Sequence, residues 1–265
     1  MIFANPVPAD MAGEYYDRLG QPYYLSPEKL ESDYASVRFE RELRLFQKHC
    51  TKGRVLDVGC SSGAFLFQLQ ARGDYRVTGT DISKPALDCA RSRGLEIIER
   101  SFLEHDFGPV RFDAVTFWAV LEHLLDPKAF LSRAVTLLKP GGHCFVLVPN
   151  MDSLAVRLLG AKYRYVFPQH VNYFTRSTLS RLAAGAGLNR VSRGSMHFNP
   201  IVIVQDWRGR GDFVSDQDRA ALLQRTTRYK RNPAMKPVKA MYSLVEKALG
   251  AANLADNLFL VLRKT

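Results

Sequence analysis

The sequence predicts an α/β protein with a seven-stranded, mostly parallel sheet and helices on both faces. From residue 54 onward, short apolar segments alternate with amphipathic ones, and the connections between them are short. The 265 residues are enough for one large core with additions. We expect an N-terminal helical arm before this core and a helical insertion before its last strand.

The first helix is predicted to begin at Ser26-Pro27-Glu28. Serine can cap a helix, proline suits the first turn, and glutamate favours the positive end of the helix dipole. We expect this helix to continue to about His49, with Val37, Leu43 and Phe46 among its buried positions.

The core elements follow in order. Apolar runs bounded by turn residues predict strands at 54–59, 76–81, 96–100, 112–118, 142–149, 189–196 and 257–264. Amphipathic spacing predicts helices at about 63–72, 84–93, 127–138 and 175–186. One further amphipathic helix is expected at 238–250, inside the insertion.

Composition limits the compartment and the partners. No apolar run approaches the roughly 18 residues needed to span a bilayer, and the N-terminus lacks a basic region followed by an apolar core. The four cysteines lie far apart, with no Cys-x-x-Cys, so we expect a reduced, cytoplasmic protein.

The net charge of +11 is unevenly distributed. Residues 1–150 hold 18 basic and 19 acidic side chains, whereas residues 151–265 hold 19 and 7. This asymmetry is typical of a protein with an anionic partner on its C-terminal side, such as a phosphorylated substrate, a lipid surface or a nucleic acid. A solvated basic face is the alternative.

The turn after the first core strand, Asp57-Val58-Gly59-Cys60-Ser61-Ser62-Gly63, carries an acid and two glycines. Gly59 permits close approach of a ligand, and Gly63 lets the next helix pack tightly. A dinucleotide-binding turn would read Gly-x-Gly-x-x-Gly, and here serine replaces the central glycine. The Asp57 carboxylate would repel a pyrophosphate but can pair with a ligand ammonium, directly or through water.

Asp81 ends the second core strand, 22 residues after Gly59. A carboxylate at this position can accept hydrogen bonds from both hydroxyls of a ribose. A turn suited to an amino acid and an acid suited to a ribose together predict S-adenosylmethionine as the ligand. Taken singly, Asp57 or Asp81 could instead cap a helix.

Several segments carry a family resemblance. VLDVGCSSG, VTGTDIS, FDAVTFWAVLEHLLDP and LLKPGGHCFVLVPN occur in the order typical of class I S-adenosylmethionine-dependent methyltransferases, which the chain resembles over about 50–150. GAKYRYVFPQHVNYFTRSTLSRLAAGAGL and MHFNPI resemble the ubiquinone-biosynthesis O-methyltransferases over about 160–201. Residues 202–250 resemble no family. The resemblance implies a Rossmann-like fold.

The resemblance also implies a domain organisation. Residues 1–50 would form an arm and helix that cap the cofactor site, and 51–200 would form the methyltransferase core. A basic helical insertion at 201–250 and the last core strand at 251–265 would complete the chain.

The resemblance places cofactor contacts on successive strand ends. Gly59 and Gly63 would surround the methionine part and Asp81 would bind the ribose, while Ile82 would pack on the adenine. Arg38 is the candidate for the methionine carboxylate, although it could be an ordinary surface charge. The predicted cofactor-binding residues are Arg38, Asp57, Gly59, Cys60, Ser61, Gly63, Asp81, Ile82, Ser101, Phe102 and Trp118.

Methylation of a hydroxyl needs a base or a metal to remove the proton. His170, in PQHVNYF, and His123, in VLEHLLDP, are the predicted catalytic residues, because histidine titrates near neutral pH. His197, in MHFNP, is a further candidate. Each of them could instead be a hydrogen-bonding strut.

A departure from the quinone branch bears on the metal. That branch carries Glu-x-x-Glu-His after the fourth strand, a pattern that can hold a divalent ion near a catechol. Here Ala119 replaces the first glutamate and only Glu122 and His123 remain, so a hard cation would lack an oxygen ligand. We therefore expect no metal, and O-methylation of a sugar, quinone-like or lipid-linked hydroxyl.

Other partners and functions stay open. The basic C-terminal half suits an RNA or DNA methyltransferase, although no nucleic-acid-binding module is recognisable. Lys239 and Lys247 on the 238–250 helix, with Lys236 just before it, suit an anionic or membrane-proximal acceptor, with the protein peripheral to the inner membrane surface. A non-catalytic cofactor-binding protein could also use this fold.

Overall fold

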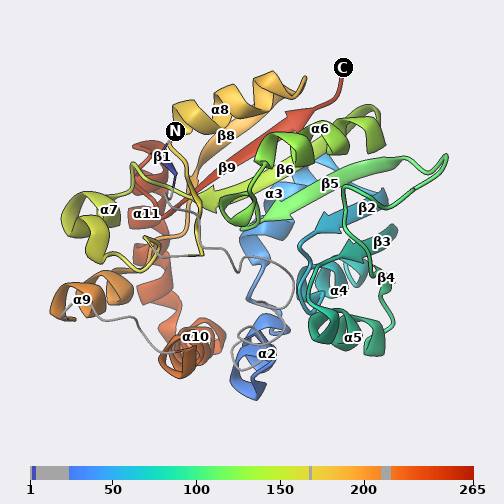
Figure 1. Cartoon of the computed structure of the whole chain (residues 1–265). Coiled ribbons are helices and arrows are strands. Elements are labelled where there is room, and N and C mark those ends of the chain that lie inside the picture. Colours follow the sequence, from blue (N-terminus) through green and yellow to red (C-terminus); the bar gives the residue numbers. More distant parts are fainter. Residues whose placement is uncertain (1, 4–23, 167–168, 210–215) are drawn as a thin grey trace.

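The computed structural model describes residues 2–3, 24–166, 169–209 and 216–265 (Figure 1). One seven-stranded sheet has the order β4-β3-β2-β5-β6-β9-β8. Its strands are β2 (Gly53–Val58), β3 (Tyr75–Thr80), β4 (Glu96–Ile98), β5 (Phe112–Trp118), β6 (Leu138–Pro149), β8 (Asn189–Met196) and β9 (Asn257–Arg263). Only β9 runs antiparallel to its neighbours. The predicted Rossmann-like, mostly parallel sheet is confirmed.

The helices cover both faces of this sheet (Figure 1). One face is covered by α3 (Glu40–His49), α4 (Ala64–Gln70) and α5 (Lys84–Ser92). There, Leu43 of α3 and Leu66 of α4 pack with Val55 of β2. The other face is covered by α6 (Pro127–Leu137) and α8 (Arg176–Gly185), whose Leu131 and Leu179 pack with strand residues. Burying each leucine contributes about 1.5–3 kcal/mol, so these faces are the main source of core stability.

The order of the strands positions the site. The chain passes outward from β2 through β3 to β4, then returns to β5 on the other side of β2. In an open parallel sheet, ligands bind beyond the carboxyl ends of the strands where the order reverses. The turns after β2, β3 and β5 therefore form the expected binding edge.

The prediction of one N-terminal helix from Ser26 to His49 is wrong. The structure has two helices, α2 (Pro27–Asp33) and α3, with a break at 34–39. The side-chain amide of Gln68 donates to the carbonyl oxygens of Asp33 and Ala35, at 2.9 and 3.0 Å. These bonds from α4 satisfy backbone acceptors that a continuous helix would have used, and they stabilise the break.

The insertion before β9 contains more helix than the sequence indicates. It holds α9 (Pro200–Arg208), α10 (Asp216–Arg231), η3 (Pro233–Met235) and α11 (Lys236–Ala251). α9 packs on α7 (Leu154–Leu159) around the buried ring of Tyr163, which follows η2 (Gly160–Lys162). α10 lies beside α2, where Gln224 donates to Glu31 at 3.0 Å (Figure 1). The insertion thus joins the segment after β6 and the N-terminal helices.

The predicted amphipathic helix is present as α11, but its apolar positions face outward. Met241 and Leu244 are 64% and 67% exposed, and Val238 is also exposed. Glu246 is instead the buried side chain, and it forms an ion pair with Arg41 of α3. Among the described residues, no helix combines the length and the apolar character that crossing a membrane requires.

Candidate active site

The glycine turn after β2 is shaped by three residues with left-handed backbone. Gly59, Ser61 and Gly63 have φ values of +74°, +50° and +79°. A Cβ on Gly59 would lie 2.5 Å from Cγ2 of Val120, and one on Gly63 would lie 2.3 Å from Cδ1 of Leu95. Both Gly59 and Gly63 must therefore be glycine, because a side chain would strain the backbone and would clash with a neighbour. The same contact shows that the turn lies directly against Val120, two positions after the end of β5.

Asp81 anchors this turn. One carboxylate oxygen accepts the backbone N–H of Ser61 at 2.8 Å, and the other accepts that of Ser83 at 3.0 Å. A carboxylate offers about four lone-pair sites, so Asp81 can orient the turn and accept from ribose hydroxyls at once. The two acids of the motif are also coupled, since the charge of Asp81 raises the pKa of Asp57.

Asp57 is buried within the sheet. Its carboxylate accepts the hydroxyl of Thr116 on β5 at 2.6 Å. Burial raises the pKa of Asp57 to about 7, although the hydrogen bond from Thr116 opposes the shift. A buried carboxylate with such a pKa gains from a nearby cation, which would favour its charged form.

The N-terminal segment reaches the turn through Tyr34, which no sequence motif marks. The Tyr34 hydroxyl donates to the carbonyl oxygen of Ser62, and the guanidinium of Arg93 lies 3.7 Å from its ring centroid. Arg38 lies in the break between α2 and α3, where its Nε donates to Asp33 at 3.2 Å. The break therefore brings Tyr34 to the turn and places Arg38 beside Asp33.

The predicted adenine contacts differ in exposure. Ile82 is 54% exposed just beyond β3, and Ser101 is half-buried. The Phe102 ring is buried and stacks on Phe130 at 5.5 Å between centroids. Ile82 and Ser101 thus lie where a ligand can reach them, whereas the ring of Phe102 belongs to the core.

Two other predicted residues lie deeper. The Trp118 ring packs edge-on against Phe65 at 5.2 Å, and its indole N–H is buried without a hydrogen-bond partner among the described residues. The buried thiol of Cys60 donates weakly to the carbonyl oxygen of Ser61 at 3.6 Å. Burial raises the pKa of this thiol, so Cys60 packs in the turn as a neutral group.

The two predicted catalytic histidines meet beyond β5. Glu122 and His123 lie in the short helix η1 (Leu121–His123), and His170 comes from the segment after α7. One oxygen of Glu122 and one ring nitrogen of each histidine lie within 4.8 Å of one another. The two imidazole rings are in edge contact, 4.7 Å between centroids. The sequence names all three residues but gives no sign that His170 joins the other two.

Backbone hydrogen bonds hold these two segments together. The N–H of Val171 donates to the carbonyl oxygen of Glu122 at 2.8 Å. The amide of Asn172, in β7 (Asn172–Tyr173), donates to the carbonyl oxygens of Leu121 and Leu124. β7 in turn pairs with β1 (Ile2–Phe3). Hydrogen bonds within the protein therefore hold the two segments of the cluster together.

Burial sets the ionisation of the cluster. It lowers the pKa of His123 to about 4 and that of His170 to about 3, and it raises the pKa of Glu122 to about 8. Both imidazoles are therefore neutral at pH 7.

His197, the further candidate, lies elsewhere. Its Nε2 is 2.8 Å from the carboxylate of Glu42 on α3. Burial alone would raise the pKa of Glu42, but the charge and hydrogen bond of His197 hold it at about 2. This pair joins β8 to α3 and matches the role of a strut.

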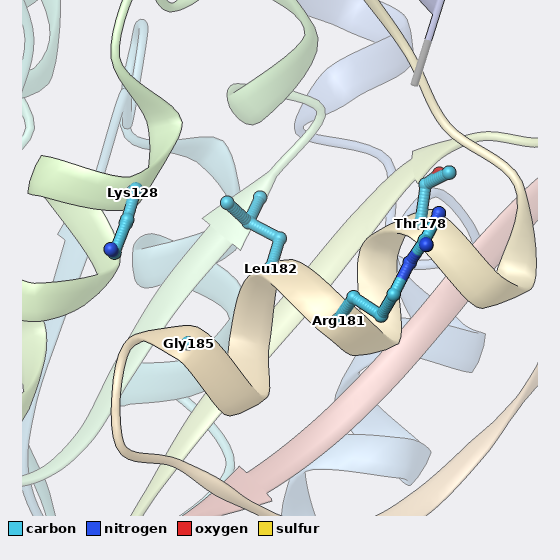
Figure 2. A pocket seen from close by; sticks show the side chains of 5 residues that line it. All are labelled: Lys128, Thr178, Arg181, Leu182 and Gly185. Carbon is cyan, nitrogen blue, oxygen red and sulfur yellow. The ribbon is translucent and has the colours of Figure 1, made fainter.

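The two halves of the site adjoin at one residue. Val120 contacts Gly59 of the cofactor turn, and Glu122 and His123 follow it two and three positions later in the chain. A separate hollow lies between α6 and α8 (Figure 2). Its lining includes no predicted cofactor or catalytic residue: Lys128, Thr178, Arg181, Leu182 and Gly185.

Comparison with known proteins decides the family. The model of the methyltransferase domain matches residues 31–193, more than half of the chain. The chain belongs to the methyltransferase domain family. The match spans the glycine turn, Asp81, η1 and His170, and it ends before the α9–α11 insertion.

Relatives of this methyltransferase refine the assignment. It is 32% identical to the ubiquinone biosynthesis O-methyltransferase of Dinoroseobacter shibae over 229 residues, which cover 78% of this chain and 88% of the relative. It is 35% identical over 162 residues to the protein of the same name from Chromobacterium violaceum, covering 56% and 69%. The predicted resemblance to the quinone branch is confirmed.

A solved structure supports the fold. A SAM-dependent methyltransferase from Thermotoga maritima, described as a possible histamine N-methyltransferase, superposes with a TM-score of 0.60 at 16% identity, covering 95% of this chain and 99% of that one. This chain is an S-adenosylmethionine-dependent methyltransferase. The nucleic-acid and non-catalytic alternatives are not favoured, because the relatives from Dinoroseobacter shibae and Chromobacterium violaceum are named as O-methyltransferases of ubiquinone biosynthesis.

Proposed function

We propose that this methyltransferase transfers a methyl group from S-adenosylmethionine to a hydroxyl oxygen of a small molecule. The observation that carries the proposal is the buried Glu122–His123–His170 cluster, which adjoins the glycine turn through Val120. A cluster at this place can accept the proton that a hydroxyl acceptor loses beside the methyl donor. The names of the quinone-branch relatives support the same chemistry.

The reaction would be a direct displacement. A lone pair of the acceptor oxygen attacks the sulfonium methyl carbon in line, and the carbon–sulfur bond breaks with its electron pair going to sulfur. Neutral S-adenosylhomocysteine leaves, and the hydroxyl proton passes to the enzyme. Holding the two reactants in near-attack geometry supplies much of the acceleration.

We propose roles for the cofactor residues on the geometry above. Gly59 and Gly63 give the methionine part room, and Asp57 would favour its ammonium. Asp81 would accept from the ribose, and Arg38 would bind the methionine carboxylate. Cys60, Ser61, Ile82, Ser101, Phe102 and Trp118 complete the predicted set.

We propose His170 and His123 as the residues that receive the acceptor's proton. Each has its Nδ1 next to a backbone carbonyl oxygen, Tyr165 for His170 and Gln169 for His123, at 2.8 and 2.9 Å. These bonds fix the orientation of the rings, and a positioned imidazole contributes about 10²- to 10⁴-fold to such a reaction.

The acceptor is proposed to be quinone-like, sugar or lipid-linked, and presented at an anionic membrane surface. Met241 and Leu244 of α11 and Trp207 of α9 are 64–70% exposed, and lysines 236 and 247 on α11 are also exposed. Exposed apolar side chains beside lysines suit the headgroup region of anionic lipids. Sedimentation with anionic vesicles, reduced in Met241→Glu and unchanged in Val191→Glu on β8, would support this location. Equal sedimentation of both variants would oppose it.

The acceptor class is tested by methyl transfer from labelled S-adenosylmethionine to catechols, sugars and lipid-linked phenols. We expect a methyl ether with at least one of these hydroxyl compounds. Transfer only to amines or to RNA would contradict the proposal.

A further inference from the structure

Lys230 lies near the end of α10, a helix outside the family match. It follows the buried Thr227 by three positions, so the two side chains are neighbours on one side of the helix. The same helix contacts α2 (Figure 1), and Nζ of Lys239 on α11 donates to the carbonyl oxygen of Lys230 at 2.6 Å. Lys230 is therefore held on the side of α10 that packs against the rest of the protein.

Four charged side chains lie close enough to Lys230 to act on its ammonium. Arg38 comes from the break between α2 and α3, and Arg41 and Glu42 come from α3. Glu246 comes from α11. Segments that are far apart in the chain thus converge on a lysine of the insertion.

Both acids of this group are already paired with other side chains. Glu246 forms its ion pair with Arg41, and Glu42 lies 2.8 Å from Nε2 of His197. In the part of the chain that the structure describes, Lys230 forms no ion pair and its ammonium has no hydrogen-bond acceptor. The fold therefore brings a cation to this cluster without giving it an anion.

The surroundings of Lys230 favour the binding of an anion. Desolvation by the nearby protein lowers the pKa of Lys230, and the charge of Arg38 adds to this effect. The side chain is nevertheless exposed, so a small ligand can reach it. An ammonium that is accessible but poorly hydrated attracts an anion more strongly than one on an open surface, because water screens the interaction less.

Lys230 is also connected to the methyl-donor site. Its neighbour Arg38 lies four positions after Tyr34, whose hydroxyl donates to Ser62 in the glycine turn. Arg38 is proposed above to bind the methionine carboxylate, and a guanidinium and a carboxylate match each other in charge and geometry. The second cation, Lys230, is therefore left for a different anion in the same site.

We propose that Lys230 binds an anionic group, a carboxylate or a phosphate, of the methyl acceptor. The inference rests on the proposed function and deepens it, because it defines the acceptor as a hydroxyl compound that carries a negative charge. A lysine ammonium is a compact charge on a flexible stem and suits either group. The position of Lys230 outside the family match agrees with a residue that selects the acceptor rather than the cofactor.

The test compares hydroxyl compounds that differ only in an anionic group. One pair is protocatechuate, a catechol carboxylate, and its neutral amide; the other is glucose phosphate and glucose. Calorimetry measures their binding to the full-length protein saturated with S-adenosylhomocysteine. We expect the wild type to bind the anionic member of at least one pair about 10- to 100-fold more tightly. Lys230→Met should abolish this preference.

Two further variants control for loss of charge and for loss of structure. Lys230→Arg keeps the charge and should keep the preference. Arg228→Met removes an exposed cation from the opposite side of the same helix and should behave as the wild type. With an anionic acceptor that is methylated, Lys230→Met should raise KM and leave kcat unchanged, because the ammonium binds a group remote from the reacting oxygen. Thermal melting checks that each variant is folded.

Decarboxylated S-adenosylmethionine shows whether the anion belongs to the cofactor or to the acceptor. Lys230→Met should bind S-adenosylmethionine with the wild-type affinity. If it bound S-adenosylmethionine more weakly but the decarboxylated compound normally, Lys230 would serve the methionine carboxylate and the proposal would be overturned.

The same measurements separate this proposal from the proposed function. Equal wild-type affinities for the charged and neutral members of both pairs would overturn the role of Lys230. Methyl transfer to the hydroxyl of a neutral member would in that case leave the proposed function standing. A folded wild-type protein that bound no S-adenosylmethionine would overturn both.

Discussion

The cofactor side and the acceptor side of the site are built in different ways. The cofactor side consists of turns that directly follow β2, β3 and β5, and Asp81 ties two of them with backbone hydrogen bonds. The acceptor side joins His123 to Gln169, 46 positions apart, and takes His170 from the same distant segment. One side is local in sequence, whereas the other depends on a long connection.

The insertion can vary without changing the residues that are proposed to bind the cofactor. The family match covers the turns and both histidines but not α9–α11. The insertion packs on the segment that leads to His170, through Tyr163 and Val202. An insertion can therefore change the acceptor without disturbing the residues that bind the cofactor. Variants on the two sides should separate binding from turnover.

The largest effect is expected for His170→Ala. Turnover should fall by about 10²- to 10⁴-fold, because the acceptor loses the group that handles its proton. The affinity for S-adenosylmethionine should stay at the wild-type value, since the glycine turn is unchanged. Initial rates with labelled donor and calorimetric titration measure the two quantities. Unchanged turnover would remove His170 from the mechanism.

The next effect is expected for Asp81→Ala. Its loss removes two hydrogen bonds to backbone N–H groups and the proposed bonds to the ribose. Hydrogen bonds to a charged group are worth about 1.5–3 kcal/mol each, so S-adenosylmethionine should bind about 100-fold weaker or worse. Asp88→Ala, on the exposed side of α5, is the control and should bind normally. Equal affinities would refute the role of Asp81.

A smaller effect is expected from pH through Asp57. Its folded pKa is about 7, above the ordinary value of 3.8, so the folded state holds the proton more tightly than the unfolded state. Tighter proton binding by Asp57 stabilises the folded state. This stabilisation is fully present below pH 3.8 and is lost as pH rises through 7. In Asp57→Asn, the free energy of unfolding should no longer fall as pH rises through 7. At pH 8 this variant should be more stable than the wild type, by roughly a few kcal/mol. Urea unfolding across pH 4–8 measures it.

A matched substitution serves as its control. Asp88→Asn, which changes an exposed acid, should keep the wild-type decline. An identical pH dependence of Asp57→Asn and the wild type would show that Asp57 is not the titrating group.

The smallest effect is expected for Tyr34→Phe. It removes the hydroxyl that donates to the carbonyl oxygen of Ser62, a bond worth about 1 kcal/mol. S-adenosylmethionine should therefore bind about 5-fold weaker, because the turn is less well held. Tyr229→Phe, on exposed α10, removes a comparable hydroxyl and should bind normally. If Tyr34→Phe bound S-adenosylmethionine with the wild-type affinity, the Tyr34 hydroxyl would have no role in cofactor binding.

Most of the fold can be predicted because its signals are local. Alternation of apolar runs places β5 and β8 at their observed bounds and the other core strands within a few residues. The break between α2 and α3 cannot be predicted in this way. It depends on Gln68, 35 and 33 positions from its two acceptors. Propensity at 34–39 gives no sign of that contact.

The site divides in the same way. The glycine turn and Asp81 are recognisable because the ligand contacts lie within one strand–turn–helix unit. His123 and His170 are recognisable as residue types, but their meeting depends on hydrogen bonds from Val171 and Asn172 to the segment around η1. Tyr34 has no motif at all, because its contribution is a single bond to a carbonyl oxygen.

Calorimetric titration of the full-length wild-type protein with S-adenosylmethionine is the decisive measurement for cofactor binding. We expect saturable binding at one site per chain, retained in His170→Ala and lost or strongly weakened in Asp81→Ala. The absence of saturable binding by the folded wild-type protein would contradict this expectation.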